Sequence, residues 1–401
     1  MTNFYKIEDA INSFSKGEMI IVVDDENREN EGDFVIAADK ITKDDITFMI
    51  KVGRGLLCMP ITKNTSDRLE LEKISSKYSS LHETAFTISV DAIKNCTTGI
   101  SSSDRYNTIK TIVDKDSKPS DLARPGHMFP LIAKEGGVLR RAGHTEAAVD
   151  LAILSKCDPS AVLIEIVDED GTMARLDRLL EISKQYNMPI ISIADLIKYR
   201  RQHTKLVKLV SKIPFPNKFG NFDLHLFEDQ IHKGNHLAIV KGNIDPESDT
   251  LVRVHSQCLT GDIFDSLRCD CGEQLDQSLQ MIEEAGSGIL VYLRQEGRGI
   301  GLKNKILAYQ LQDKGLDTVE ANEELGFPSD LREYGIGAQI LRECGVKKMK
   351  ILTNNPRKIV GLEGFGLEVV DRVPIEVESN CVNKKYMQTK RDKLGHLLIG
   401  K

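Results

Sequence analysis

Short apolar runs alternate with helical patterns through both halves of this 401-residue chain. In the first half the strand-like runs are 19–25, 33–39, 161–167 and 188–193, and the helical patterns are 144–156 and 173–187. In the second half the strand-like runs are 236–242, 250–256, 287–293 and 348–354, and the helical patterns are 304–315 and 337–344. Strands alternating with amphipathic helices are typical of α/β proteins. We therefore predict two α/β domains, each with a mixed sheet flanked by helices.

The composition changes near the middle of the chain. Between Asp195 and Asp223 there is no acidic residue but there are seven lysines or arginines, and Pro214 and Pro216 lie near the end of this stretch. We interpret it as a helix end followed by an interdomain linker. The alternative, a nucleic-acid-binding patch, lacks an aromatic ladder or a recognisable reader motif. We place the boundary near residue 203, which gives domains of residues 1–203 and 204–401.

The overall charge and hydrophobicity exclude several classes of protein. The net charge of −6 gives no reason to expect nucleic acid or an anionic membrane as a partner. The first twenty residues lack the apolar run of a signal peptide, and the longest apolar runs are too short to span a bilayer. Scattered cysteines without a small secreted domain favour reduced thiols. We therefore expect a cytoplasmic enzyme.

Three cysteines form the densest cluster of metal-ligand residues in the sequence. Cys258, Cys269 and Cys271 follow C-x10-C-x-C spacing. One intervening residue makes a Cys269–Cys271 disulfide unfavourable, so we interpret the cluster as a metal site. Three protein ligands with an exchangeable water are typical of catalytic zinc, which lowers the pKa of that water towards about 7. A structural site completed by a distant residue such as His255 is the alternative.

A glycine-rich segment and several polar residues follow the cysteines. The segment "RQEGRGIGLKNK" (294–305) places three glycines ahead of a predicted helix. Glycine allows close backbone approach, and the amides at a helix N-terminus attract phosphate. The later polar residues that suit a polyanionic ligand are Asp330, Arg332, Thr353, Arg357 and Lys358.

An acidic loop and two histidines are the main candidates in the first half. The loop, within residues 22–38, carries Asp24, Asp25, Glu26, Glu29, Glu31 and Asp33. A solvated turn is one interpretation; the other is a site for a hard cation such as Mg²⁺, which prefers carboxylate oxygens. Arg28 in the loop would give a substrate phosphate or hydroxyl a partner. His127 and His144 each follow a glycine, and Arg141 and Thr145 beside His144 suit a phosphate at a helix start.

Four segments of the second half together resemble GTP cyclohydrolase II of riboflavin biosynthesis. They are "RVHSQCLTGDIFDSLRCDCGEQL", "QEGRGIGL", "DTVEAN" and "LTNNPRK", and the resemblance covers roughly residues 204–375. It implies hydrolytic opening of the guanine imidazole ring, with release of formate and pyrophosphate. It also implies one zinc ion on Cys258, Cys269 and Cys271, and Mg²⁺ bound with the GTP phosphates.

The same resemblance assigns roles to individual residues. The implied GTP-binding residues are Arg253, Val254, His255, Ser256, Gln257, Gln274, Glu296, Gly297, Arg298, Thr318, Thr353 and Lys358. Asp330 would be the proton acceptor, Arg332 the nucleophile and Tyr309 a helper at the reaction centre. A guanidinium group stays protonated at ordinary pH, so an electrostatic clamp on the α-phosphate is a simpler role for Arg332. Both roles remain open.

The first half resembles 3,4-dihydroxy-2-butanone 4-phosphate synthase over roughly residues 5–200. The segments that carry the resemblance are the acidic loop, "TTGIS" (98–102), "RPGHMFPL" (124–131) and "RRAGHTEAAVDL" (140–151). It implies conversion of D-ribulose 5-phosphate to the butanone phosphate and formate with Mg²⁺ or Mn²⁺. Glu29 and His144 would hold the metal, and His127 and Glu165 would be catalytic. The implied substrate-binding residues are Arg28, Glu29, Glu31, Asp33, Cys58, Arg141, Ala142, Gly143, His144, Thr145 and Glu165.

Both resemblances together indicate a bifunctional enzyme that supplies the two branches of riboflavin synthesis. The implied substrates are GTP and D-ribulose 5-phosphate, and the implied assembly is a homodimer. One alternative is a chain in which only one half is active and the other is a scaffold or regulatory domain. A zinc-dependent nucleic-acid-binding protein is a second alternative, which the acidic balance of the chain disfavours.

Overall fold

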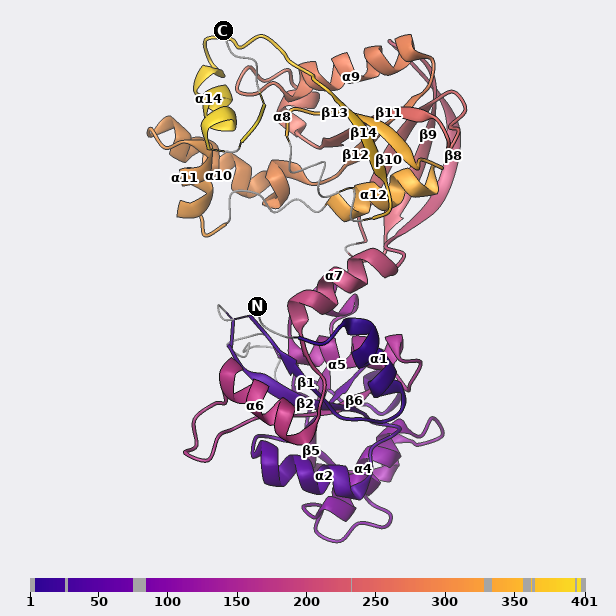
Figure 1. Cartoon of the computed structure of the whole chain (residues 1–401), viewed down its shortest axis with the longest axis vertical. Helices are drawn as coiled ribbons and strands as arrows, with labels where there is room; N and C mark the ends of the chain where they lie inside the picture. Colours follow the sequence, from indigo (N-terminus) through magenta and orange to yellow (C-terminus); the bar gives the residue numbers. More distant parts are fainter. Residues whose placement is uncertain are drawn as a thin grey trace. The chain divides into compact units, whose positions relative to one another are not determined.

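The chain divides into two compact units, Met1–His203 and Thr204–Lys401, in a computed structural model (Figure 1). The structure describes residues 4–25, 28–74, 84–231, 233–327, 334–355, 362, 365–393 and 395–397. No helix within these ranges has both the length and the apolar character needed to cross a membrane.

The first unit is a mixed seven-stranded sheet with helices around it. Its strands are β1 (Ile20–Val23), β2 (Gly32–Ala37), β3 (Cys58–Ile61), β4 (Val90–Ala92), β5 (Leu122–Ile132), β6 (Ala161–Glu165) and β7 (Ile190–Ser192). Its α-helices are α1 (Ile7–Ser15), α2 (Lys43–Phe48), α3 (Lys63–Arg68), α4 (Ser102–Val113), α5 (His144–Leu154), α6 (Leu176–Tyr186) and α7 (Ile193–His203). The strand order is β4-β5-β3-β6-β2-β1-β7.

Burial on both faces of this sheet explains why an inner strand such as β1 is apolar throughout. In β1, Ile21 and Val23 join one hydrophobic cluster, while Ile20 and Val22 join the other. Successive strand residues point to opposite faces, so a strand buried on both sides cannot alternate apolar with polar residues. The two clusters therefore fix the sheet between two layers of helices.

The second unit is also a mixed seven-stranded sheet. Its strands are β8 (Val207–Asn217), β9 (Gly220–Asp229), β10 (Asn235–Lys241), β11 (Asp249–Ser256), β12 (Gly288–Leu293), β13 (Lys348–Leu352) and β14 (Glu368–Val373). Its described α-helices are α8 (Leu259–Asp262), α9 (Cys271–Ala285), α10 (Gly301–Asp313), α11 (Thr318–Glu324), α12 (Tyr334–Glu343) and α14 (Lys384–Asp392). The order is β14-β13-β11-β12-β10-β9-β8, in which the first four strands are parallel and the others antiparallel.

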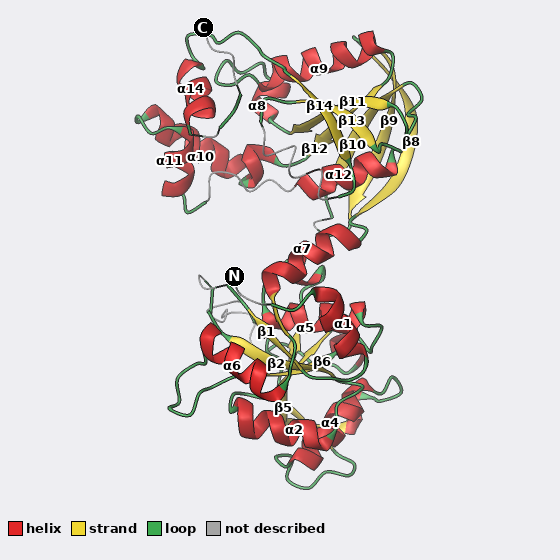
Figure 2. Ribbon diagram, viewed as in Figure 1, coloured by secondary structure: helices red, strands yellow, loops and turns green. Residues whose placement is uncertain are grey.

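Helices α9 and α12 cover opposite faces of this second sheet (Figure 2). Leu279 and Ile282 of α9 pack in one cluster with Leu290 of β12. Ile340 of α12 packs in the other cluster with Val291 of the same strand. The predicted fold class, two α/β domains with mixed sheets flanked by helices, is confirmed.

The basic stretch around residue 210 differs from its interpretation as a linker. Helix α7 ends at His203, as the predicted helix end requires, but residues 207–217 form β8, which pairs with β9 over its length. Pro214 and Pro216 lie within this strand. Proline lacks an N–H donor and is tolerated on edge strands, and β8 is the edge of its sheet. The linker interpretation was therefore wrong for most of the stretch.

Candidate functional site

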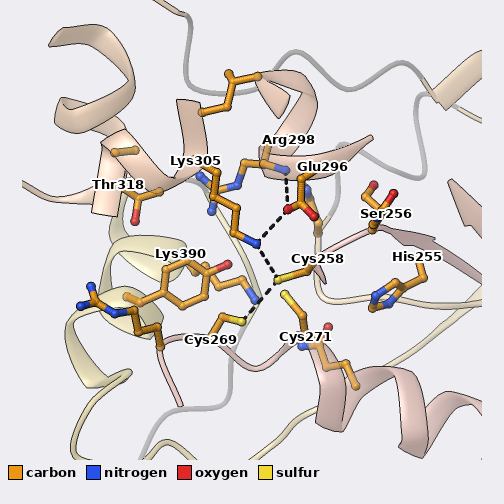
Figure 3. A pocket seen from close by; sticks show the side chains of 18 of the residues that line it. His255, Ser256, Cys258, Cys269, Cys271, Glu296, Arg298, Lys305, Thr318 and Lys390 are labelled. Atoms are coloured by element: carbon orange, nitrogen blue, oxygen red, sulfur yellow. Dashed lines mark hydrogen bonds and ion pairs between the residues drawn. The ribbon is translucent and has the colours of Figure 1, made fainter. Parts of the chain in front are cut away.

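In the second unit a pocket lies at the carboxyl ends of the parallel strands β11, β12 and β13 (Figure 3). Ser256, Leu293 and Leu352 end these strands, and the residues that follow them supply much of the pocket wall. Ligands of open α/β sheets bind at this edge because the loops that leave parallel strands converge there.

The three clustered cysteines meet in this pocket. Cys258 follows β11 and Cys271 begins α9, and the three sulfur atoms lie within 4.8 Å of one another. The Sγ atoms of Cys258 and Cys269 are 3.7 Å apart. Tetrahedral zinc, with Zn–S bonds of about 2.3 Å, places two sulfurs about 3.8 Å apart. Donor type and spacing therefore fit a zinc ion.

Gly261 allows the backbone of α8 to lie against this cluster. A Cβ atom at Gly261 would lie 2.9 Å from Cys269 Sγ and 3.2 Å from Cys258 Sγ. Contacts this short would push the sulfurs away from their positions. The glycine is therefore part of what shapes the metal site.

A buried lysine compensates the negative charge of the cysteine cluster. Lys305 Nζ lies 3.1 Å from Cys258 Sγ and 2.8 Å from Glu296 Oε1 (Figure 3). Hydrogen bonds from Cys269 and Cys271, together with the Lys305 ammonium, lower the pKa of the Cys258 thiol. Burial alone would lower the pKa of Lys305, but Glu296 and Cys258 outweigh it and raise that pKa. The site therefore stabilises a thiolate before any metal binds.

His255 has a partner other than the cysteines. Its Nε2 atom lies 3.0 Å from Asp262 Oδ1, and its ring stacks on Tyr292. Asp262 also accepts hydrogen bonds from the Cys258 amide and the Tyr292 hydroxyl, each at 2.8 Å. Among the described residues, the group of metal-ligand atoms at this site consists of the three cysteines. This arrangement favours a fourth position left to water over a structural site completed by His255.

Most of the residues predicted to bind GTP line the pocket. They are Arg253, His255, Ser256, Gln257, Gln274, Glu296, Gly297, Arg298, Thr318 and Thr353, and Tyr309 lines it with them. Val254 differs: strand alternation turns its side chain into the hydrophobic core, where it is 1% exposed. Asp330, Arg332, Arg357 and Lys358 lie outside the described residues.

Tyr309 lies near the cysteine cluster, as a helper at the reaction centre would. Its hydroxyl is 3.2 Å from Thr260 Oγ1, which is itself 3.7 Å from Cys258 Sγ. Burial raises the pKa of the Tyr309 phenol, so its hydroxyl keeps its proton at neutral pH. Tyr309 can therefore donate a hydrogen bond to a group bound beside the sulfurs.

Several pocket residues were not predicted from the sequence. They include the polar residues Arg268, Lys305, Gln312, Asn322, Asn354, Asn355, Tyr386, Lys390 and His396. Lys305, Asn322, Asn354 and Asn355 lie in or directly beside the quoted motifs, so their place along the chain was a usable signal. Tyr386, Lys390 and His396 lie beyond residue 375, where no motif was recognised.

In the first unit the acidic loop and the start of α5 form a second cluster of metal-ligand atoms. Atoms of Asp24, Glu29 and His144 lie within 4.8 Å of one another. Asp24 accepts hydrogen bonds from the amides of Glu29 and Glu31, which folds the loop around its carboxylate. Carboxylate oxygens and one imidazole suit Mg²⁺ or Mn²⁺. Glu26 lies outside the described residues.

Charges in this cluster are strongly coupled. Burial disfavours a charged His144, but Asp33 and Glu29 outweigh it and raise the pKa of the imidazole to about 9. The His144 ring, with help from Arg28, lowers the pKa of Glu29 to about 2. Metal binding displaces protons from its ligands. A divalent cation here would therefore displace the proton from His144 and supply the positive charge that the carboxylates attract.

Glu165, Asp33 and Cys58 are brought together by strand pairing. Asp33 of β2 lies opposite Glu165 of β6, and Cys58 of β3 lies opposite Leu163 of β6. Burial, followed by the charge of Glu165, raises the pKa of Asp33 to about 7. Burial beside the same carboxylates raises the pKa of the Cys58 thiol. Asp33 can therefore exchange protons near neutral pH, whereas Cys58 stays a neutral thiol beside it.

Two guanidinium groups meet at the start of α5. A Cβ atom at Gly143 would lie 2.4 Å from Arg141 Nη1 and 3.1 Å from Arg28 Nη2, so this glycine makes room for both. Ala142 lies between these residues in sequence, and the buried Thr145 is in the first helical turn. Two positive charges at a helix N-terminus suit a phosphate group.

His127 pairs with an aspartate that was not predicted. Its Nδ1 lies 2.7 Å from Asp91 Oδ2, and its amide donates to Asp91 Oδ1 at 2.9 Å. A Cβ atom at Gly99 would lie 2.0 Å from Asp91 Oδ2 and 2.5 Å from His127 Nδ1. The glycine of the "TTGIS" motif therefore leaves space for the pair. An aspartate on one ring nitrogen orients a histidine for proton transfer at the other.

Comparison with known proteins assigns each half of the chain to a family. Residues 8–199 match the 3,4-dihydroxy-2-butanone 4-phosphate synthase family, and residues 208–374 match the GTP cyclohydrolase II family. The riboflavin biosynthesis protein RibBA of Bacillus mycoides (strain KBAB4) is 56% identical over 395 residues, which cover 98% of this chain and 99% of that protein. The RibBA of Chlorobium phaeovibrioides (strain DSM 265 / 1930) is 55% identical over 98% of this chain and 96% of its own.

The chain belongs to the RibBA family of riboflavin biosynthesis proteins. It is a bifunctional enzyme that combines a lyase-class synthase domain with a hydrolase-class cyclohydrolase domain. A solved relative is RibBX from A. baumannii, described as a two-domain 3,4-dihydroxy-2-butanone 4-phosphate synthase. It is 34% identical with a TM-score of 0.68, covering 93% of this chain and 100% of its own. The two-domain fold seen here is therefore similar to that of RibBX.

Proposed function

We propose that both halves of the chain are active, with the synthase domain in residues 1–203 and the cyclohydrolase domain in residues 204–401. The first converts D-ribulose 5-phosphate to L-3,4-dihydroxy-2-butanone 4-phosphate and formate. The second hydrolyses GTP to 2,5-diamino-6-(5-phosphoribosylamino)pyrimidin-4(3H)-one, formate and pyrophosphate. The observation that carries the proposal is that each domain gathers its own cluster of metal-ligand atoms within 4.8 Å.

In the cyclohydrolase site, Cys258, Cys269 and Cys271 hold one zinc ion. Zinc supplies Lewis acidity, which lowers the pKa of bound water towards about 7. The Lys305 ammonium lies 3.1 Å from Cys258 Sγ and offsets the thiolate charge. Asp262 holds the Cys258 backbone through a 2.8 Å hydrogen bond. Together these residues keep the three sulfurs in place beside the guanine ring.

The remaining cyclohydrolase residues bind and orient GTP. Arg298 and Thr318 line the pocket, and Tyr309 presents its hydroxyl beside Thr260 near the sulfurs. We assign Asp330 to proton transfer, and Arg332 and Lys358 to the phosphates, where Mg²⁺ accompanies the triphosphate. A protonated Arg332 favours the electrostatic role over the nucleophilic one.

In the synthase site, Glu29 and His144 hold Mg²⁺ or Mn²⁺, and Asp24 is a third donor. Such a cation would supply positive charge that offsets negative charge developing on the substrate oxygens. Arg28 and Arg141 receive the substrate phosphate at the start of α5. His127, oriented by the 2.7 Å contact with Asp91, and Glu165 exchange protons with the substrate. Asp33, whose pKa is raised to about 7, can both give and take a proton near neutral pH.

The proposed setting is a homodimer in the cytoplasm with small-molecule substrates, and neither nucleic acid nor membrane as a partner. Both substrates are phosphorylated, and such molecules do not cross membranes unaided. Sedimentation equilibrium of the purified chain tests the dimer. A binding titration with duplex DNA at several salt concentrations tests the exclusion of nucleic acid.

The test of the proposed function is incubation of the purified chain with GTP and, separately, with ribulose 5-phosphate. We expect formate in both reactions, with the diaminopyrimidinone and the butanone phosphate identified by mass. Turnover of one substrate alone would support the alternative in which the other half is a scaffold or regulatory domain.

A further inference from the structure

Helix α14 (Lys384–Asp392) forms one wall of the cyclohydrolase pocket although it lies beyond the matched family region, which ends at residue 374. Tyr386 and Lys390 of this helix and the following His396 line the pocket together with the three cysteines. None of them is among the residues assigned above to zinc or GTP. The helix therefore contributes to the site in a way that the motifs do not explain.

Lys390 reaches the residue between two of the zinc ligands. Its Nζ atom lies 2.7 Å and 2.8 Å from the two carboxylate oxygens of Asp270. Asp270 separates Cys269 from Cys271, and both partners are buried, with 8% and 1% of their side chains exposed. Removing one partner of a buried ion pair destabilises the folded protein, because an unpaired charge then remains in the interior.

The orientation of Asp270 shows that the ion pair, and not the helix end, fixes this carboxylate. Asp270 is the N-cap residue of α9, a position where aspartate usually accepts a hydrogen bond from the first helical turn. Here the side chain makes no such cap. It accepts a hydrogen bond from Gln274 Nε2 at 2.7 Å, and Gln274 in turn accepts one from Arg253 at 2.7 Å. The loop that carries Cys269 and Cys271 is thus tied to α14 on one side and to β11 on the other.

Helix α14 is itself held on the unit by contacts around Lys390. Lys385 Nζ donates to the Gly315 carbonyl, and Lys393 pairs with Asp317 and with Glu320, the latter at 2.8 Å. After the helix, the Leu397 amide donates to the Asn354 carbonyl at 2.8 Å. These bonds hold Lys390 in a fixed place relative to the pocket.

We propose that Lys390 is a positioning residue of the cyclohydrolase site, which holds the Cys269–Cys271 loop in the geometry that zinc requires through its ion pair with Asp270. The inference rests on the proposed zinc site. It makes the segment after residue 374 part of the active site.

The test compares three variants of the full-length chain. Lys390→Met removes the ammonium and leaves Asp270 unpaired. The double variant Asp270→Asn/Lys390→Met removes both charges, so it loses the ion pair without leaving a buried charge, and the introduced amide oxygen can still accept from Gln274. Lys384→Met is the matched control, since Lys384 is exposed on the same helix.

The measurements are zinc affinity by chelator competition, the absorption spectrum of the cobalt-substituted protein, the thermal midpoint, and turnover of both substrates. We expect Lys390→Met to weaken zinc binding by about 10-fold, the lower end of the effect of losing an outer partner of a metal ligand, because Lys390 acts on the ligands only through Asp270. Turnover of GTP falls with it, whereas ribulose 5-phosphate turnover and the Lys384→Met control stay at the wild-type level.

The double variant separates positioning from simple stability. We expect its thermal midpoint to recover, because no unpaired charge remains, while its zinc affinity and cobalt spectrum stay altered. Wild-type zinc affinity and GTP turnover in the double variant would overturn the proposal, as would an unaffected Lys390→Met. A wild-type chain that binds zinc but does not open GTP would instead contradict the proposed function, and the zinc measurements would still judge the role of Lys390.

Discussion

The two candidate metal sites offer opposite kinds of ligand. The cyclohydrolase pocket offers three thiol sulfurs, whereas the synthase site offers two carboxylates and an imidazole. Soft sulfur donors select zinc, and hard oxygen donors select Mg²⁺ or Mn²⁺. Each site also has its own counter-charges: Lys305 contacts Cys258 in the cyclohydrolase pocket, and Arg28 pairs with Asp24 and Glu29 in the acidic loop. One chain can therefore carry two metal sites that do not compete for the same ion.

The largest expected effect is the loss of one sulfur ligand. In Cys269→Ser we expect reduced zinc content and GTP turnover at background, because three ligands are the minimum seen in catalytic zinc sites. The synthase activity should persist, since its metal has separate ligands. Zinc analysis, a circular dichroism melt and both assays test this. Collapse of the second unit on zinc loss would indicate a structural zinc, and full GTP turnover without zinc would rule out the mechanism.

The corresponding experiment in the other domain removes a charged ligand from the synthase site. In Glu29→Gln we expect butanone phosphate formation to be nearly lost at limiting Mg²⁺, while GTP turnover is unchanged. The amide cannot replace the anionic oxygen that the cation prefers. Mass detection of both products is the measurement. Near-normal turnover of ribulose 5-phosphate would remove Glu29 from the metal site.

We expect an intermediate effect on synthase turnover when a substitution changes only the space around the His127–Asp91 pair. In Gly99→Ala the new Cβ would lie 2.0 Å from Asp91 Oδ2, at a backbone φ of +89° that favours glycine. We expect synthase turnover to fall by about 100-fold, as small displacements of catalytic groups do. Steady-state kinetics should show the loss mainly in kcat. Equal loss of GTP turnover would mean that the substitution unfolds the chain more widely.

The smallest expected effect concerns charge compensation at the sulfurs. In Lys305→Met we expect zinc affinity to fall by about 10-fold, because Cys258 and Glu296 lose their shared cation. Lys303→Met, an exposed neighbour on the same helix, is the control. Chelator competition measures the change. Unchanged affinity in Lys305→Met would show that the thiolates need no compensating charge once zinc is bound.

Local spacing carried most of what the sequence predicts about the cyclohydrolase site. Cys258, Cys269 and Cys271 lie in one short segment, so their meeting follows from covalent connection. Strand-like apolar runs likewise predict the sheets, because burial on both faces leaves a clear pattern. The mixed sheets flanked by helices are confirmed in both units. The alternation of side chains along β11 also places the Val254 side chain in the core. The prediction that Val254 binds GTP did not take this into account.

Contacts between distant segments were not predictable in this way. Lys390 and Asp270 are 120 residues apart, and His127 and Asp91 are 36 apart. No spacing rule connects such residues, because the fold alone brings them together. The linker prediction was wrong for another reason. Proline usually indicates a break in secondary structure, but an edge strand such as β8 tolerates it.

The edge strand β8 affects how readily the protein aggregates in solution. Strand β8 exposes Val210 and Ile213, and an open edge of this kind is a template on which other chains can aggregate. Pro214 and Pro216 are two residues apart, so their nitrogens face the same side of the strand, where β8 lacks two N–H donors that an incoming strand would need. Lys208 and Lys212 add charge along it. The prolines and lysines that make this stretch resemble a linker therefore disfavour amyloid-like pairing of β8 with another chain.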